Sequence, residues 1–344
     1  MTDIPLPLPT ARGRPARVLG AGVMGLAVAT ELVARGHRVE VIDPAGAPGP
    51  HACSWWAGGM LAPHCEGESA EEPVERLGLG AIDWWDRETG VVTRAGTLVL
   101  ALDRDRGELA RFARRGRGHR ALTGAEIAAL EPDLAGRFGA ALFFPDEAHL
   151  DPRAALGTLR DRLAARGVAF HAAAPARAPG VVIDCRGLSA RDALPDLRGV
   201  RGEMLVLRCP EIALSRPVRL LHPRIPIYIV PRGDGVYMLG ATMIESDRRG
   251  PVTVRSVLEL LSAAYALHPA FGEAEVLETG ADARPAFPDN LPRLSRRGGT
   301  LFANGLYRHG FLLSPALAGM AAEHLETGAI PELMTPEHNE EVSA

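Results

Sequence analysis

The chain has 344 residues, and all 38 of its Lys+Arg residues are arginine, so it contains no lysine. Without lysine it cannot form the Schiff base of pyridoxal phosphate or aldolase enzymes, and it cannot supply the lysine of a phosphate-binding loop. Its 42 acidic residues give a net charge of -4, which argues against nucleic acid as the main partner.

The length predicts about two domains, and 47% apolar residues indicate a globular protein that can bury a large core. Residues 1–16 are proline-rich without an apolar signal region, and the sequence has no run of about 18 apolar residues that would cross a bilayer. We therefore expect a disordered N-terminal tail, a cytoplasmic location and no membrane contact. Neither the histidines nor the cysteines show a metal-ligand spacing, so we expect no metal site and free thiols at Cys53, Cys65, Cys185 and Cys209.

The first elements predicted along the chain form a complete βαβ unit of the dinucleotide-binding type. A strand at 17–19 leads into the glycine turn at 20–25, and an apolar helix follows. The helix stops at Gly36, and a second strand at 37–42 ends at Asp43. The order strand, glycine turn, helix, strand, acid is far more specific than a glycine motif alone.

Each glycine of this turn has a physical role in nucleotide binding. Gly20 allows the tight turn, Gly22 lets the backbone approach a pyrophosphate, and Gly25 allows the helix to pack closely on the strand. The helix N-terminus offers N–H donors and a partial positive charge to phosphates. Asp43 stands where a carboxylate can hold ribose hydroxyls.

Further along, strands and helices alternate, and then a β-rich region interrupts them. We expect helices at 70–87, 123–131, 151–166 and 254–266, and strands at 96–102, 140–144 and 180–184. Runs at 204–207, 225–230 and 236–239, separated by prolines and glycines, favour an antiparallel sheet. A last glycine turn at 305–310 begins a final helix at 311–325.

The predicted fold is therefore α/β, with a Rossmann-like nucleotide-binding domain and a discontinuous second domain of α+β type built on the antiparallel sheet. The nucleotide-binding domain takes 17–92, 142–202 and 282–330, the second domain takes 93–141 and 203–281, and tails occupy 1–16 and 331–344.

Several motifs, in order and at matching spacing, carry a family resemblance that runs from about Arg17 to Leu325. They are the glycine turn with Asp43, CSWWAGGMLAP at 53–63, DEAHLDP at 146–152, YIVPR at 228–232, GATM at 240–243, RP at 284–285 and YRHG at 307–310. Together they resemble the D-amino-acid oxidase family of flavoproteins, and the later motifs look like its glycine oxidase branch, which serves thiamine thiazole synthesis. The resemblance implies non-covalent FAD rather than NAD.

The resemblance also implies which residues contact FAD. The pyrophosphate turn and ribose site would comprise Gly20, Gly22, Val23, Met24, Gly25, Asp43 and Pro44. The ribityl and flavin side would comprise Cys53, Ser54, Ala57, Gly58, Gly59, Met60 and Gly187. Around the isoalloxazine would lie Arg284, Leu306, Tyr307, Arg308, His309, Gly310, Phe311 and Leu312.

Four residues would form the substrate site. Arg284 matches the family's carboxylate-binding arginine, whose planar fork can make two charge-assisted hydrogen bonds. Tyr228 would help to hold the same carboxylate, Arg308 would orient the substrate or complete the charge, and Met243 would limit the size of the pocket. Without its Arg-Pro context and the resemblance, Arg284 would be one surface arginine among 38.

The activity implied is FAD-dependent oxidation of glycine or a similar small amine, with O2 reduced to H2O2. The imino acid would hydrolyse to a 2-oxo acid, for example glyoxylate, and ammonia. A dehydrogenase of the same fold, acting on a D-amino acid or sarcosine with another acceptor, is an alternative. A non-catalytic or tRNA-associated FAD module is another. The resembled enzymes often form tetramers.

Two segments depart from the family pattern. The turn Asp184-Cys185-Arg186-Gly187 has a charged pair where small residues are expected, and Trp55-Trp56 replaces smaller residues beside the flavin segment. The seven arginines in 104–120 favour a solvated helix and loop over an RNA-binding patch. We expect the tryptophan pairs 55–56 and 84–85 to lie in the core.

Overall fold

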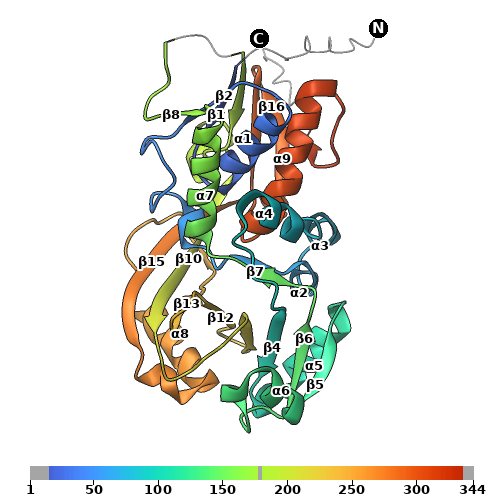
Figure 1. Cartoon of the computed structure of the whole chain (residues 1–344), viewed down its shortest axis with the longest axis vertical. Helices are drawn as coiled ribbons and strands as arrows, with labels where there is room; N and C mark the ends of the chain where they lie inside the picture. Colours follow the sequence, from blue (N-terminus) through green and yellow to red (C-terminus); the bar gives the residue numbers. More distant parts are fainter. Residues whose placement is uncertain (1–14, 177–179, 336–344) are drawn as a thin grey trace, which may run out of the picture. The chain divides into compact units, whose positions relative to one another are not determined.

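The structure, a computed structural model, describes residues 15–176 and 180–335 (Figure 1). The predicted tails therefore lie outside the described residues up to residue 14 and from 336 on. By its contacts the chain divides into two units. Unit 1 is Met1–Trp55, Leu156–Arg198 and Arg284–Ala344, and unit 2 is Trp56–Ala155 and Gly199–Ala283.

Unit 1 is built on a mainly parallel sheet with the order β18-β16-β17-β9-β1-β2-β8. Its strands are β1 (Ala16–Leu19), β2 (Val39–Ile42), β8 (Ala169–His171), β9 (Val181–Asp184), β16 (Arg293–Arg297), β17 (Thr300–Asn304) and β18 (Met334–Thr335). Its helices are α1 (Val23–Ala34), α9 (Gly310–Thr327) and most of α7 (Pro152–Ala165). Figure 1 shows α1 and α9 side by side, and both are buried on most of their surface, as expected of helices that are apolar all round.

The register of this sheet brings the predicted nucleotide-binding residues to one edge. Leu19 of β1 is opposite Ile42 of β2 on one side and opposite Asp184 of β9 on the other. The residues that follow these parallel strands, Gly20, Asp43 and Cys185, therefore lie next to one another at the carboxyl edge, where ligands bind in such sheets. The predicted βαβ unit is confirmed.

Unit 2 contains a larger sheet with the order β14-β10-β13-β12-β11-β4-β6-β5, with β15 paired to β10, and a small sheet β3-β7. The strands are β3 (Met60–Leu61), β4 (Thr97–Ala101), β5 (Arg120–Thr123), β6 (Ala140–Phe144), β7 (Ala148–His149), β10 (Arg198–Arg208), β11 (Val218–Leu221), β12 (Ile227–Pro231), β13 (Val236–Gly240), β14 (Ile244–Glu245) and β15 (Glu275–Ala286). The helices are α2 (Pro63–Glu66), α3 (Glu72–Gly78), α4 (Ala81–Thr89), α5 (Arg106–Arg115), α6 (Gly124–Leu130) and α8 (Val254–Leu267).

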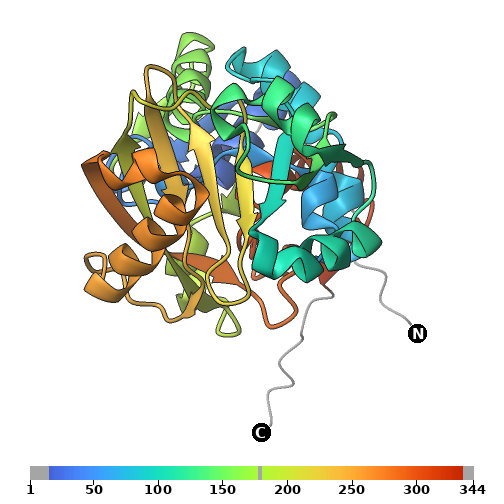
Figure 2. The same cartoon turned by 90° about the horizontal axis from the view of Figure 1, so that it is seen from below.

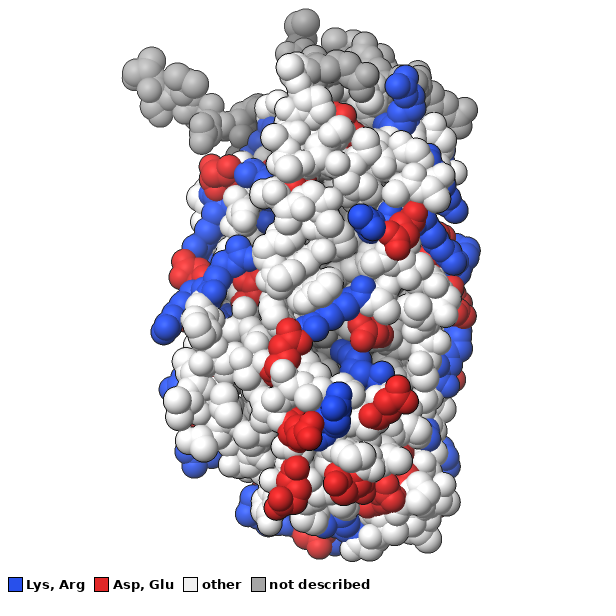
Figure 3. All heavy atoms as spheres, turned by 60° about the vertical axis from the view of Figure 1, so that its left-hand side comes forward, with Lys and Arg blue, Asp and Glu red and all other residues white. Residues whose placement is uncertain are grey.

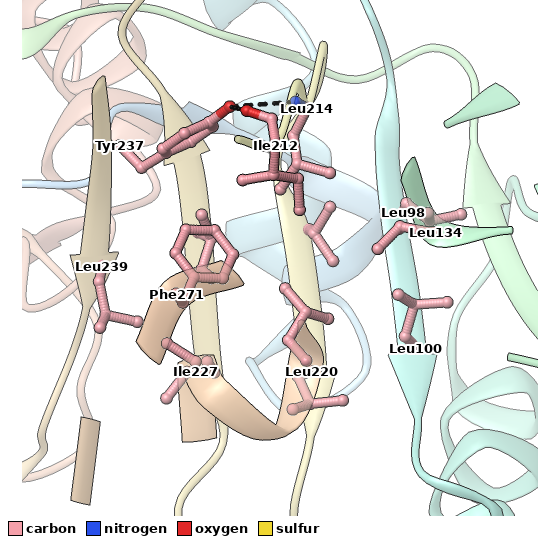
Figure 4. Close-up of a cluster of buried hydrophobic side chains, with 14 of the residues drawn as sticks. Leu98, Leu100, Leu134, Ile212, Leu214, Leu220, Ile227, Tyr237, Leu239 and Phe271 are labelled. Atoms are coloured by element: carbon pink, nitrogen blue, oxygen red, sulfur yellow. Dashed lines mark hydrogen bonds between the residues drawn. The ribbon is translucent and has the colours of Figure 1, made fainter. Parts of the chain in front are cut away.

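The expected antiparallel sheet is present, because β10, β13, β12 and β11 are successive antiparallel neighbours, whereas β11 joins β4 in parallel. Helix α8 packs on β12 and β13, as Figure 2 shows. The core between them is apolar (Figure 4). Its one drawn polar group, the Tyr237 hydroxyl, donates to the Ile212 carbonyl and accepts the Leu214 N–H at 3.2 Å.

The contacts place some segments differently from the sequence expectation. Residues 56–92 and 142–155, assigned above to the nucleotide-binding domain, belong to unit 2. Met334–Thr335, in the predicted C-terminal tail, forms β18 and pairs with β16. Among the described helices, none is both long and apolar enough to span a bilayer.

Candidate functional site

The predicted site residues fall in both units. In unit 1 the glycine turn requires glycine at two positions. Gly20 has φ +97°, and a Cβ there would lie 2.8 Å from the Cys185 carbonyl oxygen. A Cβ on Gly25 would lie 1.9 Å from the Gly20 carbonyl oxygen, so α1 can approach the turn only because Gly25 has no side chain.

Asp43 is buried at the carboxyl end of β2 and holds the turn in place. One carboxylate oxygen accepts the Ala21 N–H at 2.8 Å, and the other accepts the Ala45 N–H at 3.0 Å and lies 2.8 Å from His51 Nε2. A carboxylate has about four lone-pair sites. Three are used here, so one remains for a ribose hydroxyl. The sequence interpretation missed His51, which sits in a Gly/Pro loop with no motif around it.

Ser54 connects the segment after β2 to the start of α1. Its hydroxyl oxygen accepts the Val23 N–H at 3.3 Å and lies 3.5 Å from where a Cβ on Gly22 would be. The Val23 N–H, predicted to face the pyrophosphate, is thus directed at Ser54 here. A hydroxyl that accepts one bond can still donate its own proton to a phosphate oxygen. Cys53, half-buried and outside any disulfide, precedes it.

The two charged residues of the turn after β9, Asp184 and Arg186, pair with each other. The buried Asp184 carboxylate accepts the Arg186 N–H at 3.0 Å and its Nε at 2.8 Å, and the same guanidinium binds both Asp192 oxygens at 3.0 Å. Burial raises the pKa of the Cys185 thiol between them, which keeps it protonated. The Gly187 carbonyl accepts the Asn304 side-chain N–H at 2.9 Å. The buried Asp184 carboxylate is therefore paired with the Arg186 guanidinium.

The segment Leu306 to Leu312 leads into α9 and is tied to the Arg284-Pro285 segment. The Tyr307 N–H donates to the Pro285 carbonyl at 2.9 Å, and Tyr307 adopts φ +50°. This hydrogen bond links the residue after Arg284 to the residue before Arg308, and both of these arginines are half-buried. Gly310 starts α9, and a Cβ there would lie 3.3 Å from Val23, so the N-termini of α1 and α9 are neighbours.

In unit 2 the segment Ala57 to Met60 packs against β7. Met60 is opposite His149, and the Gly59 carbonyl accepts the Leu150 N–H at 2.9 Å. Gly59 has φ +72°, and a Cβ there would lie 2.2 Å from the Leu150 carbonyl oxygen. Burial, assisted by nearby arginines, lowers the pKa of His149 to about 4, so its imidazole is neutral near pH 7.

Tyr228, on β12, lies between two glycines. A Cβ on Gly58 would approach its ring Cε2 to 2.7 Å, and a Cβ on Gly240, its partner on β13, would approach its hydroxyl oxygen to 2.8 Å. Met243 follows β13 with 51% of its surface exposed. Its role in limiting pocket size stays a prediction.

Arg232 is the main site residue that the sequence interpretation left without a role. It follows β12 and donates to the Gly58 carbonyl at 2.8 Å and to the Leu150 carbonyl at 3.3 Å. Its motif YIVPR was recognised, but nothing in the sequence indicates that its partners are main-chain carbonyls 82 and 174 residues away.

The other expectations divide. Trp84 and Trp85 are buried with their rings at 4.9 Å, which confirms a core position, but Trp55 and Trp56 are only half-buried. The arginine-rich stretch 104–120 forms ion pairs with acids, among them Arg106–Asp103 at 2.9 Å, as a solvated surface does. Figure 3 shows arginine and acidic side chains interspersed over the face that it draws.

Comparison with known proteins gives three kinds of match. The sequence profile of a family described as FAD dependent oxidoreductase, DAO, matches residues 17–324. A Rhizobium etli protein named as a thiamine biosynthesis oxidoreductase, ThiO, is 58% identical over 90% of this chain and 96% of its own length. A glycine oxidase of Geobacillus kaustophilus is 27% identical over 90% of this chain and 92% of its own. The crystal structure of glycine oxidase from that organism has a TM-score of 0.76 with 23% identity, over 91% of this chain and 95% of that one, which shows a shared fold.

Proposed function

Because the chain belongs to the family of FAD-dependent oxidoreductases, which its sequence matches over residues 17–324, we propose that it oxidises glycine or a similarly small amino acid to the imino acid. The imino acid then hydrolyses to a 2-oxo acid, glyoxylate in the case of glycine, and ammonia. The observation that carries the proposal is 58% identity, over nearly the full length of both chains, to a protein named for thiamine biosynthesis. We place the reaction in the same pathway, as a supply of product for the thiazole.

The residues of unit 1 fit FAD. The N-termini of α1 and α9 lie next to each other, and their partial positive charges suit a pyrophosphate and a reduced flavin. Asp43 keeps one acceptor site for a ribose hydroxyl, and the turn at Gly20 to Gly25 leaves main chain bare of side chains. When bound, FAD would supply the redox chemistry of the reaction: acceptance of a hydride from the substrate Cα and transfer of two electrons to O2, with H2O2 as the product.

The chain's own part is to bind and orient the amino acid. In this proposal the Arg284 fork makes two parallel hydrogen bonds to the substrate carboxylate, and the Tyr228 hydroxyl donates a third. The Tyr307–Pro285 bond supports Arg284 from the main chain, because it fixes the residue that follows it. Arg308 and the α9 N-terminus supply positive charge in a chain that has no lysine. Met243 limits the length of the substrate.

An amine screen tests the proposal. Purified protein is supplied with glycine, sarcosine or D-alanine in air, and oxygen consumption, peroxide and bound-flavin absorbance are followed. We expect a yellow protein that forms peroxide with glycine. Bleaching of the flavin without peroxide would instead indicate a dehydrogenase with another acceptor, and a colourless protein from which denaturation releases no flavin would remove the enzymatic proposal. Gel filtration tests the accompanying proposal of a homotetramer.

A further inference from the structure

Arg232 combines burial with an unusual set of partners. Only 11% of its side chain is exposed, and the nearest carboxylate oxygen, on Asp151, lies 3.7 Å from its Nε. Its shortest side-chain hydrogen bond goes to a main-chain carbonyl, that of Gly58, at 2.8 Å. Burying a guanidinium costs several kcal/mol unless hydrogen bonds compensate. The buried Arg232 guanidinium therefore binds main-chain carbonyls rather than a close carboxylate partner.

The backbone that Arg232 holds belongs to two segments. Gly58 lies in the segment Ala57 to Met60, and Leu150 follows β7. A Gly58-Gly59 pair has no side chains to pack and loses much conformational entropy when ordered. Both of its carbonyls are held: the Gly59 carbonyl accepts the Leu150 N–H, and the Gly58 carbonyl accepts from Arg232. One guanidinium that binds the Gly58 and Leu150 carbonyls together sets the distance between these segments.

Strand β12 also contacts Gly58 through Tyr228. Tyr228 lies on β12 and Arg232 is the first residue after it, and both side chains contact Gly58. The Tyr228 ring covers the Cα of Gly58, where a Cβ would be only 2.7 Å away, and Arg232 binds the Gly58 carbonyl. If the glycine pair shifts, the surface on which the phenol rests shifts with it.

We propose that Arg232 is a positioning residue, which fixes the Gly58-Gly59 main chain against β7 and thereby places the Tyr228 phenol and the flavin-side segment. The substrate part of this inference rests on the proposed function, because it takes Tyr228 as a substrate-binding residue. The structural part, that Arg232 orders the segment, does not depend on which substrate is used.

The test compares Arg232→Met with the matched control Arg216→Met. Arg216 also lies in unit 2, has 13% of its side chain exposed, and donates to the carbonyls of Ala95 and Leu130 while pairing with Glu131. Both variants lose a largely buried cation bound to carbonyls, so both should be less stable. Arg232→Lys keeps the charge but not the fork, and provides a milder variant if Arg232→Met does not fold.

Five quantities are measured on each holoprotein: the melting temperature, FAD content after gel filtration, the visible spectrum of bound FAD, and KM and kcat for the best amine. For Arg232→Met we expect a shifted FAD spectrum and a KM raised between about tenfold and a hundredfold, with a smaller change in kcat. Arg216→Met should keep the wild-type spectrum and KM. In a Tyr228→Phe background the effect of Arg232→Met on KM should shrink, because the two residues act through one contact.

The inference is overturned if Arg232→Met and Arg232→Lys match Arg216→Met in spectrum and KM, or if the effect on KM is undiminished in the Tyr228→Phe background. A different result would refute the proposed function. If the wild-type protein retains FAD but oxidises no amine, the proposed activity is wrong, and the FAD spectrum and content of the variants still decide whether Arg232 positions the segment.

Discussion

The ring of Tyr228 rests on the main chain of Gly58, so closely that a Cβ on that glycine would come within 2.7 Å of ring atom Cε2. The phenol also lies against Gly240, its partner across the β12–β13 ladder. Two close contacts with glycine main chain limit the freedom of this side chain, so the backbone helps to place its hydroxyl. Three separate segments, 57–60, β12 and β13, together determine that position.

Replacing Gly240 with alanine is expected to displace the Tyr228 phenol, since the new methyl would lie 2.8 Å from the hydroxyl oxygen, 2.9 Å from Cζ and 2.9 Å from Cε2. The KM for the amine should rise about tenfold, with FAD content unchanged, because Gly240 is outside the residues expected to bind FAD. Steady-state kinetics and flavin absorbance measure the two effects.

Gly107→Ala is the control for this substitution, because a Cβ at that position in α5 meets nothing within 4 Å. It should leave KM unchanged. An alanine at 240 that left KM at the wild-type value would show that the phenol can move without consequence for substrate binding.

Removing the Asp43 carboxylate is expected to weaken FAD binding even though the fold persists. Asp43→Ala deprives the buried N–H group of Ala21 of its acceptor, at a cost of about 1 to 3 kcal/mol, and also removes the acceptor of the more exposed Ala45 N–H, which water can replace. The turn at Gly20 should then loosen, and the FAD dissociation constant, measured by fluorescence titration of apoprotein, should rise at least tenfold.

His51→Ala tests the other partner of the same carboxylate. Its imidazole is more exposed than Asp43, so its loss should change FAD affinity by only about 0 to 1 kcal/mol. Equal losses in the two variants would mean that His51, and not the N–H groups of the turn, is what makes Asp43 important.

The sequence predicts the nucleotide-binding unit well because the signals there are local. Gly25 is required by a contact within the turn and Gly20 by its φ of +97°, and the helix and second strand follow at once. Strand β6 was likewise expected at its observed bounds, 140–144. Short-range sterics and apolar periodicity carry this information, and both can be read from neighbouring residues.

The rest depends on contacts that no local pattern encodes. Strand β15 was missed, and Gly280 at its middle reads as a chain breaker. The structure shows the reason for this glycine: a Cβ would lie 2.0 Å from the Trp56 ring, so packing by a distant residue requires it. Arg232 is a similar case, because its carbonyl partner Gly58 is 174 residues away. The domain boundaries shifted for the same reason, since residues 56–92 join unit 2 by tertiary contacts alone.

Substituting Arg284 is expected to affect substrate far more than cofactor. Arg284→Ala removes the proposed carboxylate partner, and losing one side of a charge-assisted pair costs about 2 to 5 kcal/mol, so KM should rise about thirtyfold or more. Arg284→Lys keeps the charge without the planar fork and should be intermediate. Both KM and FAD content are measured.

Arg35→Ala is the control, since Arg35 forms a surface pair with Glu326 at 3.0 Å in the same unit. It should behave as the wild type. If Arg284→Ala is purified without bound FAD, this arginine binds the cofactor rather than the substrate.

His149 should make the protein less stable in mild acid. Its imidazole pKa is lowered to about 4, mainly by burial and then by repulsion from Arg232 and Arg216, whereas in the unfolded chain it is about 6.5. The unfolded chain therefore binds this proton first. The contribution of His149 to the free energy of unfolding is highest above about pH 6.5 and falls as the pH drops toward 4. By pH 5 the loss from this residue is about 2 kcal/mol.

Urea unfolding of the wild type and of His149→Gln at about pH 7.5 and pH 5 isolates the contribution of His149 to the pH dependence of stability, because other titrating groups act on both proteins alike. The variant should lose about 2 kcal/mol less than the wild type over this range. Between about pH 7.5 and 9 the two should respond identically, since the imidazole is neutral in both states there. A wild-type loss equal to that of the variant would mean that His149 is protonated as easily in the fold as in the unfolded chain, and that water reaches the ring beside Met60.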